Sequence, residues 1–156
     1  MPLESAVKYS DGIKGSNGKK GRAGTSAVVE FNHQVYSPRD TQMGSFTGAR
    51  VHGEVEVVKE IDTASAPLYQ AVCTGQVLKE LAVDWYRINP SGQEEVYFTH
   101  TLTNVRVASV EQMLPNTKDP AKETQGHLER LRLLYEQISW KHIEGFEYED
   151  AWKDVK

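Results

Sequence analysis

The sequence predicts a mainly β, mostly antiparallel domain with one short helix. Three observations favour this fold class. Apolar and polar residues alternate along several segments, and turn-forming clusters separate those segments. Residues that are typical of helix ends flank one short stretch. At 156 residues the chain has the length of one domain. A domain of this size can bury roughly 70% of the surface that its unfolded chain exposes, so it needs no disulfide to be stable.

The first third of the chain predicts three strands and two loops. Residues 5–10 form a short candidate strand, and residues 11–25 form a Gly-rich loop that lacks the GKS or GKT of a phosphate-binding loop. Residues 26–36 alternate and predict a half-buried strand, with His33 in phase with its apolar side. The inward set is Ala27, Val29, Phe31 and Val35, and the outward set is Ser26, Glu30, Asn32 and Gln34.

A long connection then leads to the next strand. Residues 37–49 contain two glycines and a proline, and Phe46 in this otherwise polar loop indicates a contact surface. Residues 50–61 resume the alternation of a strand. The inward set here is Val51, Val55, Val57 and Ile61, and the outward set is Arg50, His52, Glu54, Glu56 and Glu60.

Residues 62–89 predict a helix that leads directly into a long strand. Ser65 is the expected N-cap, Pro67 suits the first turn, and Gly75 suits the left-handed position after the last turn. The helix would have about eight or nine residues and must pack on a sheet to persist. Its apolar stripe is Leu68, Ala71 and Val72. From residue 77 the inward set is Val77, Leu81, Val83 and Trp85, and the outward set is Glu80, Asp84 and Tyr86.

The turn cluster at residues 89–93 predicts an antiparallel hairpin with a strand at residues 95–107. Thr99, Thr101 and Thr103 share one side of this strand, which suits a solvated or lumen-facing sheet surface. The alternation loses phase near Asn104, so residues 105–113 are expected to continue the strand across a bend or bulge. Residues 114–126 form a second long polar loop.

The periodicity of residues 127–144 favours a helix, although part of the segment also alternates like a strand. The remaining residues are acidic and aromatic, and we expect them to be mobile or to dock on a neighbour. The expected organisation is therefore one domain at residues 1–145 followed by a tail at residues 146–156.

Composition excludes several classes of function. The 18 basic and 22 acidic residues give a formal charge of −4, which argues against a nucleic-acid partner. No apolar segment is long enough for membrane insertion, and no signal peptide is recognisable, so synthesis in the cytoplasm is expected. Cys73 is the only cysteine and is expected to be a small buried apolar residue.

No catalytic, cofactor-binding or metal-binding motif is recognisable, and the sequence therefore predicts a protein that is not an enzyme. His33, His52 and His100 lie on predicted strands, but no HxH or HExxH spacing occurs, and the strand phases place His33 and His52 on different faces. Cys73 has no identifiable histidine partner, and no GxSxG sequence occurs. Glu54 and Glu56 share a strand face and serve solubility.

Three stretches, taken in order, resemble the haemolysin co-regulated protein family, the tube subunit of bacterial type VI secretion systems. These stretches are VKYSDGIKG, ASAPLYQAVCTGQVLKELAVDWYR and ISWKHIEG, and the likeness spans nearly the whole chain. QMLPNTKDPAKE and EDAWK resemble the enterobacterial branch of the family.

The resemblance implies a two-sheet, β-barrel-like domain with the helix outside, six copies in a ring, and rings stacked into a tube. Such a structural protein would leave the cell without a cleavable signal peptide. Its implied partners are further copies of itself, a spike protein, a contractile sheath and effector proteins carried in the lumen. Cys73 would then pack beneath the sheet.

The resemblance also implies roles for particular residues. Lumen-facing positions are Glu30, Asn32 and Gln34, and the loop at residues 37–49 would bridge adjacent rings through Arg39, Asp40, Gln42 and Phe46. The family has strands where the periodicity favours a helix, so two strands are expected at residues 128–137 and 138–143.

Two other functions remain open from the sequence. A monomeric β-barrel that binds a small ligand would need an enclosed apolar cavity, whereas a tube subunit should have a filled barrel core. A relative of phage tail-tube proteins would share the ring architecture.

Overall fold

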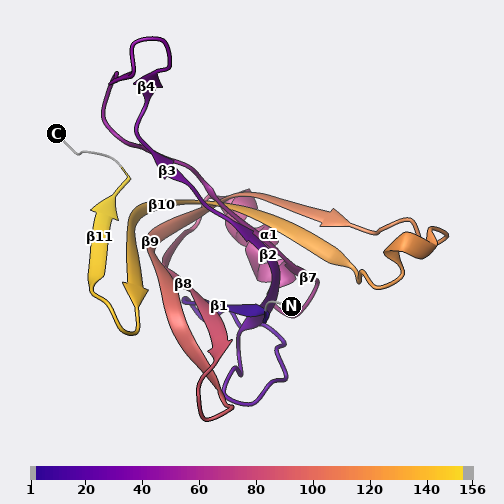
Figure 1. Cartoon of the computed structure of the whole chain (residues 1–156). Helices are drawn as coiled ribbons and strands as arrows, with labels where there is room; N and C mark the ends of the chain where they lie inside the picture. The colour runs from indigo at the N-terminus through magenta and orange to yellow at the C-terminus, as the bar shows by residue number, and fades with distance from the viewer. Residues whose placement is uncertain (1–2, 153–156) are drawn as a thin grey trace.

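The computed structural model describes residues 3–152, and its main feature is a closed antiparallel β-barrel (Figure 1). The strands are hydrogen-bonded in the order β11-β10-β7-β2-β1-β8-β9, and pairing of β9 with β10 closes the barrel, leaving β11 outside it. The barrel strands are β1 (Ser5–Tyr9), β2 (Ser26–Asn32), β7 (Val55–Glu60), β8 (Val77–Ile88), β9 (Glu94–Met113) and β10 (Leu128–His142). The predicted mainly β, barrel-like fold is confirmed.

The interior of the barrel is filled by side chains. Apolar residues from all six barrel strands point inward and pack in layers, as in other small barrels. Residues with no exposed surface include Val7, Val55, Val57, Leu81, Val83, Leu102, Val105, Leu131, Leu133 and Ile138. Such burial is the main favourable contribution to the free energy of folding.

The predicted strand phase is wrong in β2 and at the start of β8. In β2 the register shifts between Val28 and Glu30, so Val28 points inward and Val29 is 54% exposed. Ser26, predicted to face outward, is also buried and accepts a hydrogen bond from Tyr9 at 2.8 Å. At the start of β8, Leu78 is buried in place of the exposed Val77.

The segment predicted as one strand at residues 50–61 is divided. A two-residue strand, β6 (Val51–His52), precedes β7, and Gly53 between them donates its N–H to the Gln34 carbonyl at 2.7 Å. Within β6 the predicted directions are reversed, since His52 is buried and Val51 is exposed. Ile61, predicted inward, is also exposed.

Helix α1 (Ser65–Thr74) lies outside the barrel and packs on β9. Leu68 and Ala71 of the predicted stripe are buried, and Gly75 takes the predicted left-handed conformation (φ 73°) after the last turn. Two expectations are wrong here. Ser65 is not the N-cap, because its hydroxyl donates to Glu129 at 3.0 Å, and Cys73 lies on the exposed side of the helix.

A buried ion pair anchors β7 and β10 beneath the start of α1. Lys59 Nζ lies 2.6 Å from Glu129 Oε2, and neither side chain has exposed surface. Asp62 is a second partner of Lys59 at 2.9 Å, and Gln112 donates to Glu129 at 2.9 Å. Because every charge in this cluster is hydrogen-bonded, removing one partner would leave an uncompensated buried charge.

In the β8–β9 hairpin, the predicted turn at residues 89–93 and the predicted bend near Asn104 are both confirmed. Asn89 accepts two backbone hydrogen bonds in the tight turn, and Gly92 takes a positive φ of 82°. At Asn104, where the alternation loses phase, φ is 54° and the strand continues to Met113. The loop that follows contains one helical turn, η1 (Pro120–Lys122).

Residues 127–144 do not form the helix that their periodicity favours, and the extended structure that the family resemblance implies is confirmed. They form the single strand β10, which is continuous across the expected junction of two strands at Gln137 and Ile138. β10 pairs with β9 along its whole length, with β7 along its first half and with β11 (Glu147–Ala151) along its second. These three sets of hydrogen bonds outweigh the helical propensity of the segment.

The predicted tail is therefore partly ordered within the same chain. β11 extends the sheet beyond the barrel, and Trp152 packs on the hydrophobic core. Residues 153–156 of the predicted tail lie outside the described residues. In the part of the chain that the structure describes, no helix is long and apolar enough to cross a membrane.

Candidate assembly surfaces

A long hairpin, here called the arm, projects from the barrel and comprises residues 35–52 (Figure 1). Its base is the pairing of β3 (Val35–Tyr36) with β6, and its outer part is the pairing of β4 (Arg39–Asp40) with β5 (Ser45–Phe46). The Thr47 N–H donates to the Pro38 carbonyl at 2.9 Å between the two ladders. The arm is therefore hydrogen-bonded along its length, although it projects into solvent.

The tip of the arm combines an ordered turn with exposed apolar side chains. Asp40 Oδ1 accepts hydrogen bonds from the N–H groups of Gln42 at 2.8 Å and Met43 at 3.2 Å, and Gly44 takes the positive φ (71°) that the turn needs. Met43 and Phe46 are 78% and 74% exposed. Of the predicted bridging residues, Asp40 thus shapes the turn, whereas the other three are exposed: Arg39, Gln42 and Phe46.

The base of the arm is locked to the barrel and to β11 by a hydrogen-bonded chain. Arg50 donates to both carboxylate oxygens of Asp150, with Nη2 at 2.8 Å from Oδ1. Asp150 Oδ2 also lies 2.8 Å from His52 Nε2, and His52 Nδ1 lies 2.6 Å from the Tyr135 hydroxyl. The same hydroxyl lies 2.8 Å from His33 Nε2. One continuous network thus joins the arm, β10 and β11.

The prediction that His33 and His52 point to different faces is wrong. Both imidazoles meet at the Tyr135 hydroxyl, and His33 also contacts His100 with ring centroids 6.0 Å apart. The error follows from the reversed phase of β6, which turns His52 into the protein. Within the described residues, no group of three or more His, Cys, Asp or Glu side chains could hold a metal ion.

Burial controls the protonation of this cluster. Burial lowers the pKa of His33 to about 4, with a further contribution from His52, and burial lowers the pKa of His100 to about 4 as well. Both are therefore neutral at pH 7, which suits the 3.0 Å hydrogen bond that Trp85 Nε1 donates to His100 Nδ1. The hydrogen bond from Arg50 holds the pKa of Asp150 below its usual range.

A polar sheet surface, here called the wall face, lies on the outside of β2, β7 and β10. It contains the three predicted lumen residues, all exposed, together with charged residues from β10 and from the β6–β7 segment. Its members are Glu30, Asn32, Gln34, Glu54, Glu56, Arg130 and Arg132. The alternation of residues 50–61 indicated the glutamates as a solvated strand face, whereas the periodicity of residues 127–144 favours a helix and assigned no strand face to the arginines.

The charges of the wall face are largely paired. Glu56 Oε2 lies 3.2 Å from Arg130 Nε and 3.1 Å from Arg132 Nη2. Asn32 Nδ2 lies 3.4 Å from Glu56 Oε1 and 3.5 Å from Glu30 Oε2, at the outer limit of a hydrogen bond. The face therefore presents hydrophilic groups to water without a large apolar patch.

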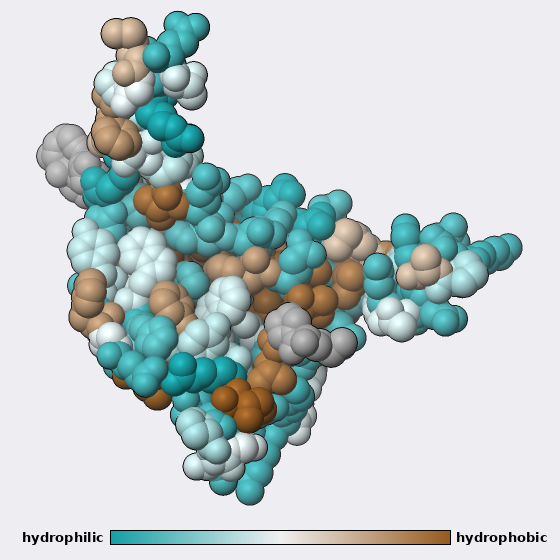
Figure 2. All heavy atoms as spheres, in the orientation of Figure 1, coloured by the Kyte–Doolittle hydropathy of each residue, from teal (hydrophilic) through white to brown (hydrophobic). Residues whose placement is uncertain are grey.

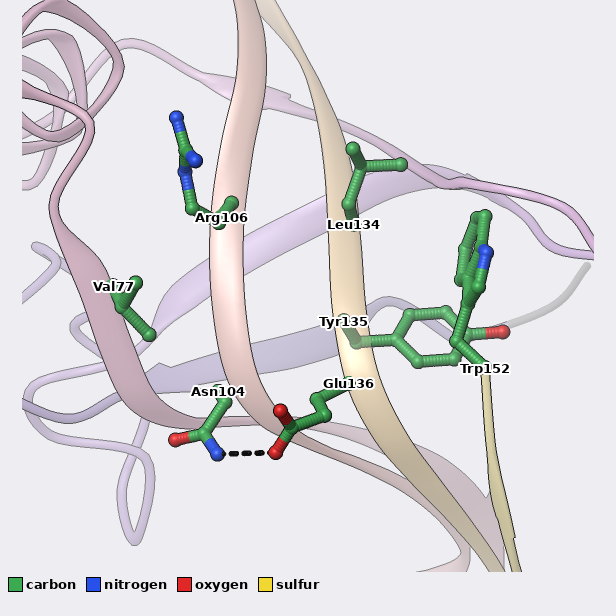
Figure 3. A pocket seen from close by; sticks show the side chains of 7 residues that line it. All are labelled: Val77, Asn104, Arg106, Leu134, Tyr135, Glu136 and Trp152. Atoms are coloured by element: carbon green, nitrogen blue, oxygen red, sulfur yellow. Dashed lines mark hydrogen bonds between the residues drawn. The ribbon is translucent and has the colours of Figure 1, made fainter. Parts of the chain in front are cut away.

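The outer surface of the barrel also has an open groove of about 510 Å³ between the start of β8 and the end of β11 (Figure 3). Val77, Leu134 and Trp152 supply its apolar surface, Arg106 lies at one side, and Asn104 donates a 2.7 Å hydrogen bond to Glu136. The groove lies outside the filled barrel, so it is not the enclosed cavity that a small-ligand barrel would require.

Comparisons with known proteins identify the family. The family model described as "Type VI secretion system effector, Hcp" matches residues 7–142. This chain belongs to the Hcp family. The "Major exported protein" of Pseudomonas aeruginosa is 32% identical over 152 residues, which cover 97% of this chain and 88% of that protein.

Solved Hcp structures share the fold along the whole chain. The Hcp1 protein of E. coli EAEC 042, in a variant with two tryptophan substitutions, has a TM-score of 0.84 and 38% sequence identity, covering 98% of this chain and 99% of its own. Secreted protein Hcp3 from Pseudomonas aeruginosa has a TM-score of 0.71 at 23% identity, and the match covers 96% of this chain and 99% of Hcp3. The chain is thus a type VI secretion system protein with the Hcp fold.

Proposed function

We propose that this chain is the tube subunit of a type VI secretion system, which closes into hexameric rings and stacks through its arm into an exported tube. The single observation that carries the proposal is the Hcp family match over residues 7–142. In the structural comparison with Hcp1, the matched region includes 98% of this chain and 99% of Hcp1. A closed ring of identical subunits repeats one heterologous contact around its axis, so modest patches suffice to hold it.

In this proposal the wall face lines the lumen. Its exposed residues Glu30, Asn32 and Gln34 supply hydrogen-bonding groups, and the paired guanidinium and carboxylate groups keep the surface hydrophilic. Such a surface retains its water, so a protein cargo could slide along it without strong apolar adhesion. Effector proteins would be the cargo, and a spike protein and a contractile sheath would be the other partners.

The arm is the proposed contact between rings. It projects well beyond the barrel, and its tip carries Arg39, Gln42 and Phe46 in exposed positions on a turn that Asp40 orders. An exposed phenylalanine on a hydrogen-bonded projection is typical of a protein contact, because burying it against a partner releases apolar surface from water. Export of the assembled rings would then deliver the protein outside the cell.

The competing proposal of a monomeric small-ligand barrel has less support. The inward side chains that fill the barrel leave Leu81, Val83, Leu102 and Ile138 with no exposed surface, and the groove of Figure 3 opens on the outside. A phage tail-tube relative would share the ring, but the 38% identity to Hcp1 favours the secretion system.

The mass of the purified protein in solution tests the proposal. Native mass spectrometry should give six times the chain mass of 17.5 kDa, and negative-stain images should show rings with a central hole. A protein that stays monomeric at high concentration would overturn the tube-subunit proposal. The arm and the wall face are tested separately by the variants described below.

A further inference from the structure

The orientation of the arm depends on contacts at its base, because its outer part projects clear of the barrel (Figure 2). One hydroxyl group makes two of these contacts. Tyr135 Oη lies 2.8 Å from His33 Nε2 and 2.6 Å from His52 Nδ1. His33 lies two residues before β3, and His52 ends β6, so this hydroxyl ties both ends of the arm to β10. These three residues and Asp150 are here called the base lock.

The partners in the base lock fix the direction of each hydrogen bond. The Asp150 carboxylate is an acceptor only, so His52 Nε2, which lies 2.8 Å from it, carries a hydrogen. When His52 is neutral, its Nδ1 is therefore an acceptor and receives the hydrogen of the Tyr135 hydroxyl. The Tyr135 oxygen then accepts a hydrogen bond from His33 Nε2. Every polar group in this chain has a suitable partner while both histidines are neutral.

The base lock has room for one added proton but not for two. A proton on His52 makes Nδ1 a donor, so the Tyr135 hydroxyl turns and donates to His33 Nε2 instead. The resulting imidazolium remains bound to Asp150, which Arg50 also holds. A second proton, on His33, leaves two N–H donors facing one hydroxyl, whose own hydrogen then has no acceptor in the base lock. It also places two positive charges around that hydroxyl.

The groups around His33 do not offset a positive charge on it. His100 of β9 faces His33 with ring centroids 6.0 Å apart, and the Trp140 ring of β10 lies 6.2 Å away. Three charged residues line the open surface beside His33, but their charges are paired with one another, and within the described residues none is hydrogen-bonded to it: Glu54, Glu56 and Arg132. Burial and the nearby His52 accordingly lower the pKa of His33 to about 4.

We propose that the base lock is a proton-responsive device, which opens when His33 and His52 are both protonated and frees the arm from β10 while the barrel stays folded. The two-residue ladder of β3 and β6 then loses its support and opens locally. The acidity of the solution thus sets whether the arm holds a fixed orientation. This inference concerns the arm within one chain and does not depend on the proposed contact between rings.

Hydrogen exchange of the full-length protein between pH 7 and pH 4 tests the base lock. After correction for the intrinsic exchange rate at each pH, the amides of β3 and β6 should lose protection by about tenfold or more. The reason is that each unit between the ordinary pKa of His33 and its value of about 4 is a factor of ten in the opening equilibrium. The amides of β8, in the barrel, should stay better protected at every pH. Unchanged protection of β3 and β6 down to pH 4, or its loss only together with that of β8, would overturn the proposal.

His33→Gln separates the effect of the proton from a purely structural role. The glutamine amide can donate to or accept from the Tyr135 hydroxyl but gains no proton, so protection at the arm base should be as high at pH 4 as at pH 7. A decline as large as in the wild type would count against the base lock. The wild-type comparison of the arm base with β8 decides the proposal independently of how this variant folds.

His142→Gln is the matched control. His142 ends β10, and within the described residues its side chain hydrogen-bonds only the Glu144 N–H, at 3.0 Å. This variant should lose protection at the arm base with the same dependence on pH as the wild type. Loss of the pH response in both histidine variants would show that the base lock is not its source.

Discussion

Asp150 joins the arm to β11 through one carboxylate, since it binds Arg50 and His52 from the arm and belongs to β11. Its side chain is 14% exposed, so its three hydrogen bonds, two from Arg50 and one with His52, are partly shielded from water. The position of the arm therefore depends on a residue almost 100 positions later in the chain. The sequence indicates this segment only as an acidic tail, because pairing across that distance leaves no local pattern.

Asp150→Asn should destabilise the protein by about 1–3 kcal/mol, because Arg50 and His52 lose a shared charged acceptor. Urea denaturation measures the loss, and hydrogen exchange should become faster at the base of the arm. Glu149→Gln is the matched control, since the Glu149 side chain is exposed and has no hydrogen bond or ion pair within the described residues. Equal stability of the two variants would contradict the locking role of Asp150.

Acid should weaken the fold through the buried histidines. The pKa of His100 is about 4 in the folded protein and about 6.5 in the unfolded chain, so the unfolded state binds more protons between these values. Stability should therefore fall as the pH decreases from 6.5 to 4, by about 2 kcal/mol from His100. Denaturation at several pH values checks this, and His100→Gln should flatten the profile. A profile with the same slope in that variant would assign the effect elsewhere.

For single elements, the sequence predicts the inward side of a strand correctly where apolar and polar residues alternate without interruption, and wrongly where a bulge shifts the alternation. The α1–β8 unit follows from Gly75 at the end of the helix and from the two-residue alternation after it, and the hairpin turn follows from the cluster at residues 89–93. The reversed phases of β2 and β6 do not, because the bulge after Val28 and the break at Gly53 depend on pairing with distant strands. The periodicity of β10 favours a helix, but three neighbouring strands hold it extended, so strands could be expected there from the family resemblance and not from the local pattern.

The arm supplies a prediction at this scale. Replacing both Arg39 and Phe46 with serine should weaken ring stacking by at least about tenfold and leave single rings intact, because both side chains lie at the tip and neither contributes to the core. Sedimentation and electron microscopy separate stacks from rings. Leu114→Ser, on the other long loop, is the control. Tubes of normal length in the double variant would exclude this loop as the bridge between rings.

Helix α1 gives a second test, since Cys73 lies on its exposed side. A thiol reagent should label the native protein once per chain, and labelling should persist in assembled rings if the helix lies on the outside of the tube. Intact-mass measurement before and after assembly reads out the label, and Cys73→Ser should take none. Protection of the thiol on ring closure would instead place α1 at the contact between subunits.

For the whole molecule, the barrel separates two surfaces that an assembly can use independently. The arm projects from the barrel in Figure 1, whereas the wall face lies on the strands β2, β7 and β10. A filled core holds these surfaces in fixed positions. Substitutions confined to one surface should consequently affect one property of the tube and leave the others unchanged.

Asn32→Lys is the sharpest test of this separation. Asn32 is exposed and contacts only Glu30 and Glu56 at the limit of hydrogen bonding, so the substitution should cost less than about 0.5 kcal/mol in stability. Hexamers and stacks should form normally, because the proposed lumen position keeps the added charge away from the contacts between subunits. Six added cations per ring should increase retention of an acidic probe protein and decrease retention of a basic one. Loss of ring closure in this variant would instead place the wall face at a contact between subunits.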